Sequence, residues 1–280
     1  MLVIAGIGLY GLRDLPLGVI EIARGADRIY LEQYTSLAPG FSLEALEELF
    51  GKHVEEVARQ DLEEQSGREL LEQARKSTVL LLTFGHPLIA TTHTSLVVEA
   101  RKAGIPVKIL PAPSVFDGVI CSTGLHVYRF GRPVTLVFPE RGRKIYPYTT
   151  YAVIRDNLRR GLHTLLLLEI RRQEGVYMDV ATAAALLLEL EEVFHEHVIS
   201  EDTLAIGVAR ATAPDEVVKV GELRELAGED FGPPPHSVVI PGVLHDSEIE
   251  FLSSVHGAPV EVMINWNKHV KKRLESTFEP

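Results

Sequence analysis

Three glycines near the start of the chain have the spacing of a dinucleotide-binding loop. The apolar run Leu2–Ala5 is followed by Gly6, Gly8 and Gly11, a literal G-x-G-x-x-G, and the next apolar run ends on Glu32. In a Rossmann unit such glycines let the backbone approach a pyrophosphate, and an acid about 20 residues further on bonds a ribose hydroxyl. This pattern supports one hypothesis, an oxidoreductase that uses NAD(P). A tight turn that binds no ligand explains the same glycines equally well.

Two features weaken the dinucleotide hypothesis. Arg13 and Asp14 stand where the first turn of a phosphate-binding helix should be small and apolar. Pro16 suits the first position of a helix, so the helix would start late, after an extra stretch of loop. The segment could therefore wrap an adenosine without cradling a pyrophosphate.

A second candidate loop follows the apolar run Val79–Leu82. Gly85 and Pro87 end this run, which predicts a strand buried on both faces and followed by a tight loop. The segment Ser95–Gly104 has helical spacing, so the loop lies between a central strand and its helix. In open α/β sheets ligands bind at this place, and Gly85 lets the backbone come close to one. Taken alone, however, this stretch is better explained as an ordinary βα turn.

The sequence contains no local signature of a nucleophile or of a metal. G-x-S-x-G and Walker A motifs are absent, and the eleven histidines are scattered without metal-ligand spacing. What remains is a set of small or apolar loops at predicted strand ends, which suits a flat organic ligand with few polar contacts. These loops are residues 6–11, 85–92, 112–115, 168–169, 210–211 and 235–236.

Composition excludes several classes of protein. The chain has 280 residues, 46% of them hydrophobic and 24% charged, and a formal net charge of −11. It therefore has no global positive field for nucleic acid or anionic lipid. A single cysteine, the lack of a basic leader and the absence of a membrane-length apolar run predict a cytoplasmic protein. The loop Pro139–Pro147 carries Arg141, Arg143 and Lys144, which predicts a solvated loop or a contact with an acidic partner.

The elements that must position these loops alternate between strand and helix. The first half predicts a mostly parallel sheet, with a capping box at Ser66 and Glu69 opening the helix that ends at Ala74. Its five strands are Leu2–Ala5, Arg28–Glu32, Val54–Ala58, Val79–Leu82 and Val107–Leu110. The pattern changes past Ser114, and the second half predicts strands at Val134–Phe138, His163–Ile170, Asp202–Ala211, Val217–Val220 and Ser237–Pro241. We therefore expect two α/β domains, residues 1–113 and 114–280.

A family resemblance rests on seven segments taken together. They are GIGLYGLRDL, LEQYTS, GHPLIATTH, PAPSV, GLHTLLLLEI, ARA and PPPHSVVIPG, in this order along nearly the whole chain. In combination they resemble the diphthine synthase family, within the tetrapyrrole-methylase-like group of S-adenosylmethionine-dependent methyltransferases. The family usually has aspartate where this chain has His86.

The resemblance implies a non-Rossmann methyltransferase fold with the cofactor S-adenosylmethionine in a cleft between the two domains, and S-adenosylhomocysteine as a product. It implies a homodimer whose protein substrate is translation elongation factor 2. The reaction would methylate, repeatedly, the amino group of a 3-amino-3-carboxypropyl-histidine side chain to give diphthine, a step of diphthamide biosynthesis. Carried over by motif, the cofactor contacts would be Leu9, His86, Ile89, Ser114, Val115, Leu168, Ala211 and His236.

The sequence therefore supports three hypotheses about function. The methyltransferase leads. The NAD(P)-dependent oxidoreductase and a non-catalytic nucleotide-binding module are the alternatives. In methyl transfer the substrate supplies the nucleophile, so the sequence identifies no catalytic residue and predicts no metal.

Overall fold

The computed structural model describes residues 1–34, 36–64 and 67–277. The described chain forms two compact units, Met1–Gly118 and a second unit that begins at Val119. The division lies five residues after the boundary expected at residues 113 and 114, and it falls within helix α5 (Val115–Thr123). Each unit is built on its own five-stranded sheet.

The sheet of the first unit is entirely parallel, as the alternation of strands and helices predicts. Its strands are β1 (Leu2–Gly6), β2 (Arg28–Glu32), β3 (Glu55–Val57), β4 (Val79–Thr83) and β5 (Val107–Leu110), in the order β3-β2-β4-β1-β5. Strands β1 and β4 are buried along their whole length, which is why they appear in the sequence as continuous apolar runs.

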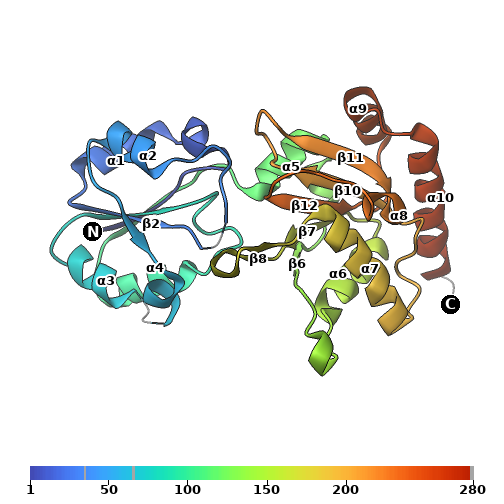
Figure 1. The fold of residues 1–280 in the computed structure, drawn as a ribbon, viewed down its shortest axis with the longest axis horizontal. Helices are drawn as coiled ribbons and strands as arrows, with labels where there is room; N and C mark the ends of the chain where they lie inside the picture. Colours follow the sequence, from blue (N-terminus) through green and yellow to red (C-terminus); the bar gives the residue numbers. More distant parts are fainter. Residues whose placement is uncertain (35, 65–66, 278–280) are drawn as a thin grey trace. The chain divides into compact units, whose positions relative to one another are not determined.

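Helices cover both faces of this sheet (Figure 1). Helices α1 (Leu17–Gly25) and α2 (Leu43–Phe50) pack on one face, against the core that contains Val3, Ala5 and Leu82. Helices α3 (Arg68–Ala74) and α4 (Thr94–Lys102) pack on the other, against the core that contains Ile4 and Leu81. The alternation of side chains along each strand thus divides one apolar run between two cores.

The second unit has a mixed sheet of order β11-β10-β12-β7-β6. The pair β6–β7 is parallel and the other three pairs are antiparallel. Its strands are β6 (Val134–Leu136), β7 (Thr164–Leu168), β10 (Leu204–Ala209), β11 (Val217–Glu222) and β12 (His236–Ile240). The helices are α6 (Tyr148–Leu158), α7 (Val180–Phe194), α8 (Leu223–Leu226), α9 (Asp246–His256) and α10 (Val260–Thr277). All five strands expected in this half are present.

The late start of the first helix is confirmed, because the first glycine loop contains a 3-10 turn, Gly11–Asp14, and α1 begins only after Pro16. Other details differ from the expectations or lie outside the described residues. A two-stranded ribbon, β8 (Ile170–Arg171) with β9 (Val176–Tyr177), and helix α10 were not predicted. Ser66 of the expected capping box lies outside the described residues.

Candidate functional site

The loops after β1, β4 and β5 meet at one edge of the first sheet, because parallel strands all end at the same side. The amide of Gly85 donates to the carbonyl of Gly8 at 2.8 Å, and the amide of Ile7 donates to the carbonyl of Thr83 at 2.9 Å. A Cβ atom at Gly6 would lie 2.2 Å from the Gly85 carbonyl oxygen and 2.9 Å from the Cβ of Ala112. Glycine at this position is therefore what allows the three loops to come together.

The glycine loop is closed by a carboxylate from its own chain. Oδ2 of Asp14 accepts hydrogen bonds from the amides of Leu9 and Tyr10, at 2.9 and 2.8 Å. These are the amides that a pyrophosphate on this loop would need, and an anion would also meet the Asp14 charge. Glu32, the expected ribose ligand, is fully buried. The site therefore does not fit the NAD(P) hypothesis.

The loop between β4 and α4 presents His86 and Ile89. Gly85 and Ala90 adopt left-handed conformations, with φ of 65° and 57°. Nδ1 of His86 accepts a hydrogen bond from the amide of Leu88 at 3.1 Å, so a neutral His86 ring carries its hydrogen on Nε2. Ile89 is more than a third exposed. The loop thus offers one apolar side chain and one donor.

Ser114 is buried and its side chain is engaged within the fold. Its hydroxyl donates to Oδ2 of Asp117 at 2.6 Å, and its amide donates to the same oxygen at 2.7 Å. Burial raises the pKa of the Asp117 carboxyl, but these two hydrogen bonds outweigh that effect, and the pKa lies below its ordinary value. The Ser114 hydroxyl therefore has no hydrogen left to donate to a ligand, and a ligand contact would use its remaining acceptor capacity, backbone groups or the Val115 side chain.

The three candidates in the second unit also share one edge of their sheet. Leu168 ends β7, His236 begins the antiparallel strand β12, and Ala211 follows the end of β10. The register pairs Ala209 with His236, so the ends of β10 and β12 are adjacent. The structure thus brings together five candidates within the first unit and three within the second.

Arg210 holds the loop that contains Ala211. Its side chain is 5% exposed, and its guanidinium donates to the carbonyl of Phe231 at 2.8 Å and to Oδ2 of Asp215 at 2.7 Å. Arg210 and Thr212 have φ of 51° and 69°, a conformation that costs energy for residues other than glycine. Ala211 is therefore held between two strained residues by a buried arginine.

The His236 ring is occupied on both nitrogens. Nδ1 accepts from the amide of Val180 at 3.2 Å, and Nε2 lies 3.0 Å from the carbonyl oxygen of Pro233, to which it donates. Burial lowers the pKa of this imidazole, which keeps the ring neutral at neutral pH. In this conformation neither ring nitrogen of His236 is available for a hydrogen bond to a ligand.

Asp14, Asp117 and Arg210 support the candidate loops, a role that was not predicted for them from the sequence. Ser114-x-x-Asp117 has the spacing of a helix cap, so this signal was present. Asp14 and Arg210 act through contacts that no local pattern contains.

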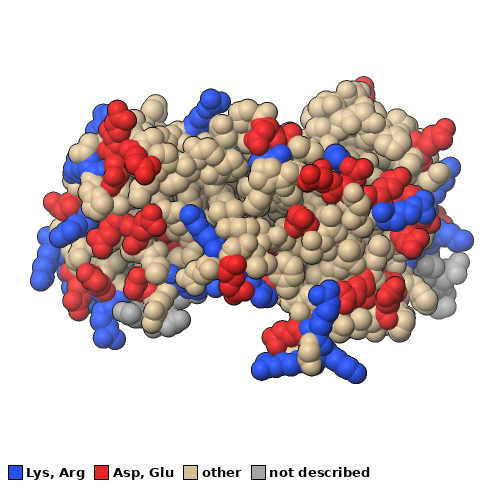
Figure 2. All heavy atoms as spheres, viewed as in Figure 1, with Lys and Arg blue, Asp and Glu red and all other residues tan. Residues whose placement is uncertain are grey.

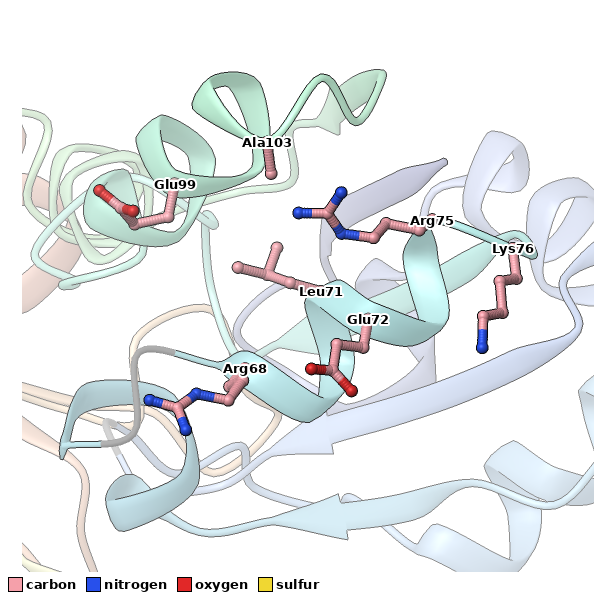
Figure 3. A pocket seen from close by; sticks show the side chains of 7 residues that line it. All are labelled: Arg68, Leu71, Glu72, Arg75, Lys76, Glu99 and Ala103. Carbon is pink, nitrogen blue, oxygen red and sulfur yellow. The ribbon is translucent and has the colours of Figure 1, made fainter.

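The other surface features of the described residues do not involve the candidate loops. A groove between α3 and α4 is lined by Arg68, Leu71, Glu72, Arg75, Lys76, Glu99 and Ala103, and contains none of the candidate residues (Figure 3). Figure 2 shows both signs of charge interspersed over the visible face. Among the described residues no cluster of His, Cys, Asp or Glu could hold a metal ion, and no helix is long and apolar enough to cross a membrane.

Two of the three basic side chains in the loop Pro139–Pro147 form ion pairs with nearby glutamates. Arg141 pairs with Glu189 at 2.7 Å, and Arg143 pairs with Glu140 at 3.2 Å. Exposed pairs of this kind contribute little to stability.

Comparisons with known proteins define the class. Residues 1–227 match the family model of the tetrapyrrole (corrin/porphyrin) methylases. The chain is 42% identical over 254 residues to the diphthine synthase of Methanocaldococcus jannaschii, covering 90% of this chain and 97% of that protein. It is also 42% identical over 252 residues to the diphthine synthase of Methanococcus maripaludis strain C5, with the same coverage. A crystal structure of a diphthine synthase matches with a TM-score of 0.83 and 36% identity, covering 94% of this chain and 99% of that one.

The chain therefore belongs to the tetrapyrrole methylase family, and it is a methyltransferase. Within that family it belongs with the diphthine synthases, whose reaction is a step of diphthamide biosynthesis. The fold class and the family resemblance drawn from the sequence are confirmed.

Proposed function

We propose that this protein transfers methyl groups from S-adenosylmethionine to the amino group of a 3-amino-3-carboxypropyl-histidine side chain on translation elongation factor 2, giving diphthine. The observation that supports this proposal most strongly is the 42% identity to a diphthine synthase across 97% of that protein's length. We further propose a cytoplasmic homodimer with elongation factor 2 as its protein partner.

The first-unit loops suit the cofactor's neutral adenosine end better than a phosphate. The amides of Leu9 and Tyr10 are already bonded to Asp14. A Cβ atom at Gly85 would meet only the Leu9 side chain and the Pro113 carbonyl, each at 3.9 Å, so space and an acceptor adjoin this glycine. The proposed contacts are the eight residues of the two strand-end sets, five in the first unit and three in the second.

The residues of this chain act in the reaction by holding and aligning the reactants. Bound S-adenosylmethionine supplies the transferable methyl group on a sulfonium. Alignment and desolvation of donor and acceptor supply on the order of 7–11 kcal/mol when the geometry is good. The small and apolar loops around Gly85 and Ala211 would exclude water from a bound ligand, whereas the described residues at these edges include no side chain that we assign as a base.

Calorimetry with the full chain tests the cofactor proposal. We expect S-adenosylmethionine and S-adenosylhomocysteine to bind with micromolar affinity, about −8 kcal/mol, and NAD(H) not to bind. Binding of NAD(H) in preference to both would contradict the proposal.

Paired variants test whether both units contribute. Ile89→Asp in the first unit and Ala211→Asp in the second should each weaken binding at least tenfold, since each places a charge against an apolar ligand surface. Val98→Asp and Val255→Asp are matched controls, because these valines are 49% and 59% exposed on α4 and α9. If only one of the two site variants weakened binding, the proposal that residues of both units contribute to cofactor binding would be wrong.

A further inference from the structure

Two buried polar side chains beneath the loop of residues 84–93, those of Glu32 and His93, have no role in the function proposed above. Glu32 ends β2 and is the register partner of Thr83 at the end of β4, which pairs in turn with Gly6 at the end of β1. Register partners project from the same face of a sheet. This row therefore presents Glu32, Thr83 and a bare Gly6 to the face that α3 and α4 cover.

The loop is seated on this row at its beginning. A Cβ atom at Gly6 would lie 3.1 Å from Cδ of Pro87, so Pro87 packs directly on Gly6. The carbonyl of Pro87 points back into the loop and accepts a hydrogen bond from the hydroxyl of Thr91 at 2.7 Å.

The end of the loop is fixed to the same carbonyl by His93. The His93 side chain is 2% exposed, and its Nδ1 lies 3.1 Å from the Pro87 carbonyl oxygen. A carbonyl oxygen only accepts, so Nδ1 carries the hydrogen of this bond. The buried His93, which immediately precedes α4, therefore connects the end of the loop to Pro87 near its beginning.

The opposite edge of the ring faces Glu32. Nε2 of His93 lies 3.7 Å from Oε2 of Glu32, whose side chain is fully buried. This separation is too long for a hydrogen bond, and Nε2 has no other hydrogen-bond partner in the described part of the chain. The ring thus lies between the Pro87 carbonyl, to which it donates, and the buried Glu32 carboxyl, which packs beside its other nitrogen without a hydrogen bond.

We propose that Glu32 and His93 are a positioning pair, which holds the 84–93 loop in the conformation that presents His86 and Ile89 to the cofactor. The identity of that cofactor rests on the proposed function. The loop's conformation in the free protein does not, so the two can fail separately.

Two substitutions of His93 separate positioning from general packing. In His93→Asn the side-chain amide falls near the position of Nδ1 and can still donate to Pro87, whereas it cannot reach Glu32. In His93→Gln the amide falls near Nε2, so the Pro87 carbonyl keeps only the hydrogen bond from the Thr91 hydroxyl. Both variants remove buried volume, so both should lower Tm.

Hydrogen exchange of the ligand-free protein gives the first readout. Amides in residues 84–93 should exchange about 3- to 10-fold faster in His93→Gln, the effect of one lost hydrogen bond, and by a smaller factor in His93→Asn, which keeps the bond to Pro87 and loses only the contact with Glu32. S-adenosylmethionine affinity, measured by calorimetry, should follow the same order. His126→Asn is the control, because that side chain is 41% exposed and lies in the second unit.

The role of Glu32 is tested by coupling. Glu32→Gln should accelerate exchange in the same residues, and the double variant with His93→Gln should be no worse than His93→Gln alone. Additive effects would remove Glu32 from the pair. Equal exchange in His93→Asn and His93→Gln, or faster exchange in His93→Asn, would overturn the proposal. If the wild-type protein binds no S-adenosylmethionine, the proposed function fails, and the exchange rates still decide the role of the pair.

Discussion

Removal of the Asp14 carboxylate should loosen the first glycine loop. One of its oxygens accepts hydrogen bonds from the amides of Leu9 and Tyr10, at 2.9 and 2.8 Å. Hydrogen bonds to a charged acceptor contribute about 1.5–3 kcal/mol each, and the partial exposure of these two favours the lower figure. Asp14→Ala should therefore cost about 3 kcal/mol in the free energy of unfolding, a fall in Tm of about 6–12 °C.

The same variant separates two uses of the loop. If the loop supports a contact of Leu9 with S-adenosylmethionine, Asp14→Ala should weaken that binding by about 3- to 10-fold, measured by calorimetry beside thermal melting. Asp14→Asn is the control, because its side-chain amide oxygen still accepts hydrogen bonds. It should keep about half of the stability that Asp14→Ala loses. An unchanged Tm in Asp14→Ala would refute the reasoning, since it would show that the two hydrogen bonds to Asp14 do not stabilise the loop.

Three further predictions concern other contacts. Gly6→Ala should destabilise the protein by about 2 kcal/mol or more, because the new methyl group meets the Gly85 carbonyl at 2.2 Å, whereas Gly18→Ala, with open space in α1, should be neutral or stabilising; a common loss of Tm would contradict this. His86→Asp should keep the wild-type Tm, since a carboxylate can also accept from the Leu88 amide, and His86→Ala should lower the Tm. Equal melting of the two variants would show that this hydrogen bond adds no stability. Burial raises the pKa of Glu248, but hydrogen bonds from His163 and two backbone amides outweigh this effect and hold that pKa below its ordinary value. The contribution of Glu248 to stability is therefore present above about pH 4.3, and it is lost as the pH falls through the lower pKa of the folded state. Glu248→Gln should therefore be less stable at pH 7 and show a flatter decline of Tm below pH 5; parallel curves would exclude this role.

The parts of the fold that could be predicted are those with a local physical cause. Strands β1 and β4 are buried on both faces, which requires a continuous apolar run, and Gly85 and Pro87 mark the loop that follows. The directions of the strands in the second sheet could not be predicted, because pairing between distant strands is not written in any one segment. The ribbon of β8 and β9 has two residues in each strand, too few for a period of two to appear.

The candidate site divides in the same way. The positions of the loops followed from strand ends, and the structure brings them together within each unit. The groups that hold the loops act over long separations in sequence, as with Arg210 and the carbonyl of Phe231, 21 residues apart. Glu32 shows the limit most clearly: its spacing from the glycines suggests a ribose ligand, and only the fold reveals that it is buried beside His93.

Methyl transfer to the proposed protein substrate tests the central claim most directly. Elongation factor 2 that carries the 3-amino-3-carboxypropyl-histidine would be incubated with this protein and S-adenosylmethionine, and the modified peptide would be weighed by mass spectrometry. We predict mass gains of whole methyl groups on that side chain, none on elongation factor 2 with unmodified histidine, and none on a tetrapyrrole. Methylation of a tetrapyrrole at a comparable rate, or no transfer under conditions where the Methanocaldococcus jannaschii enzyme is active, would contradict the account.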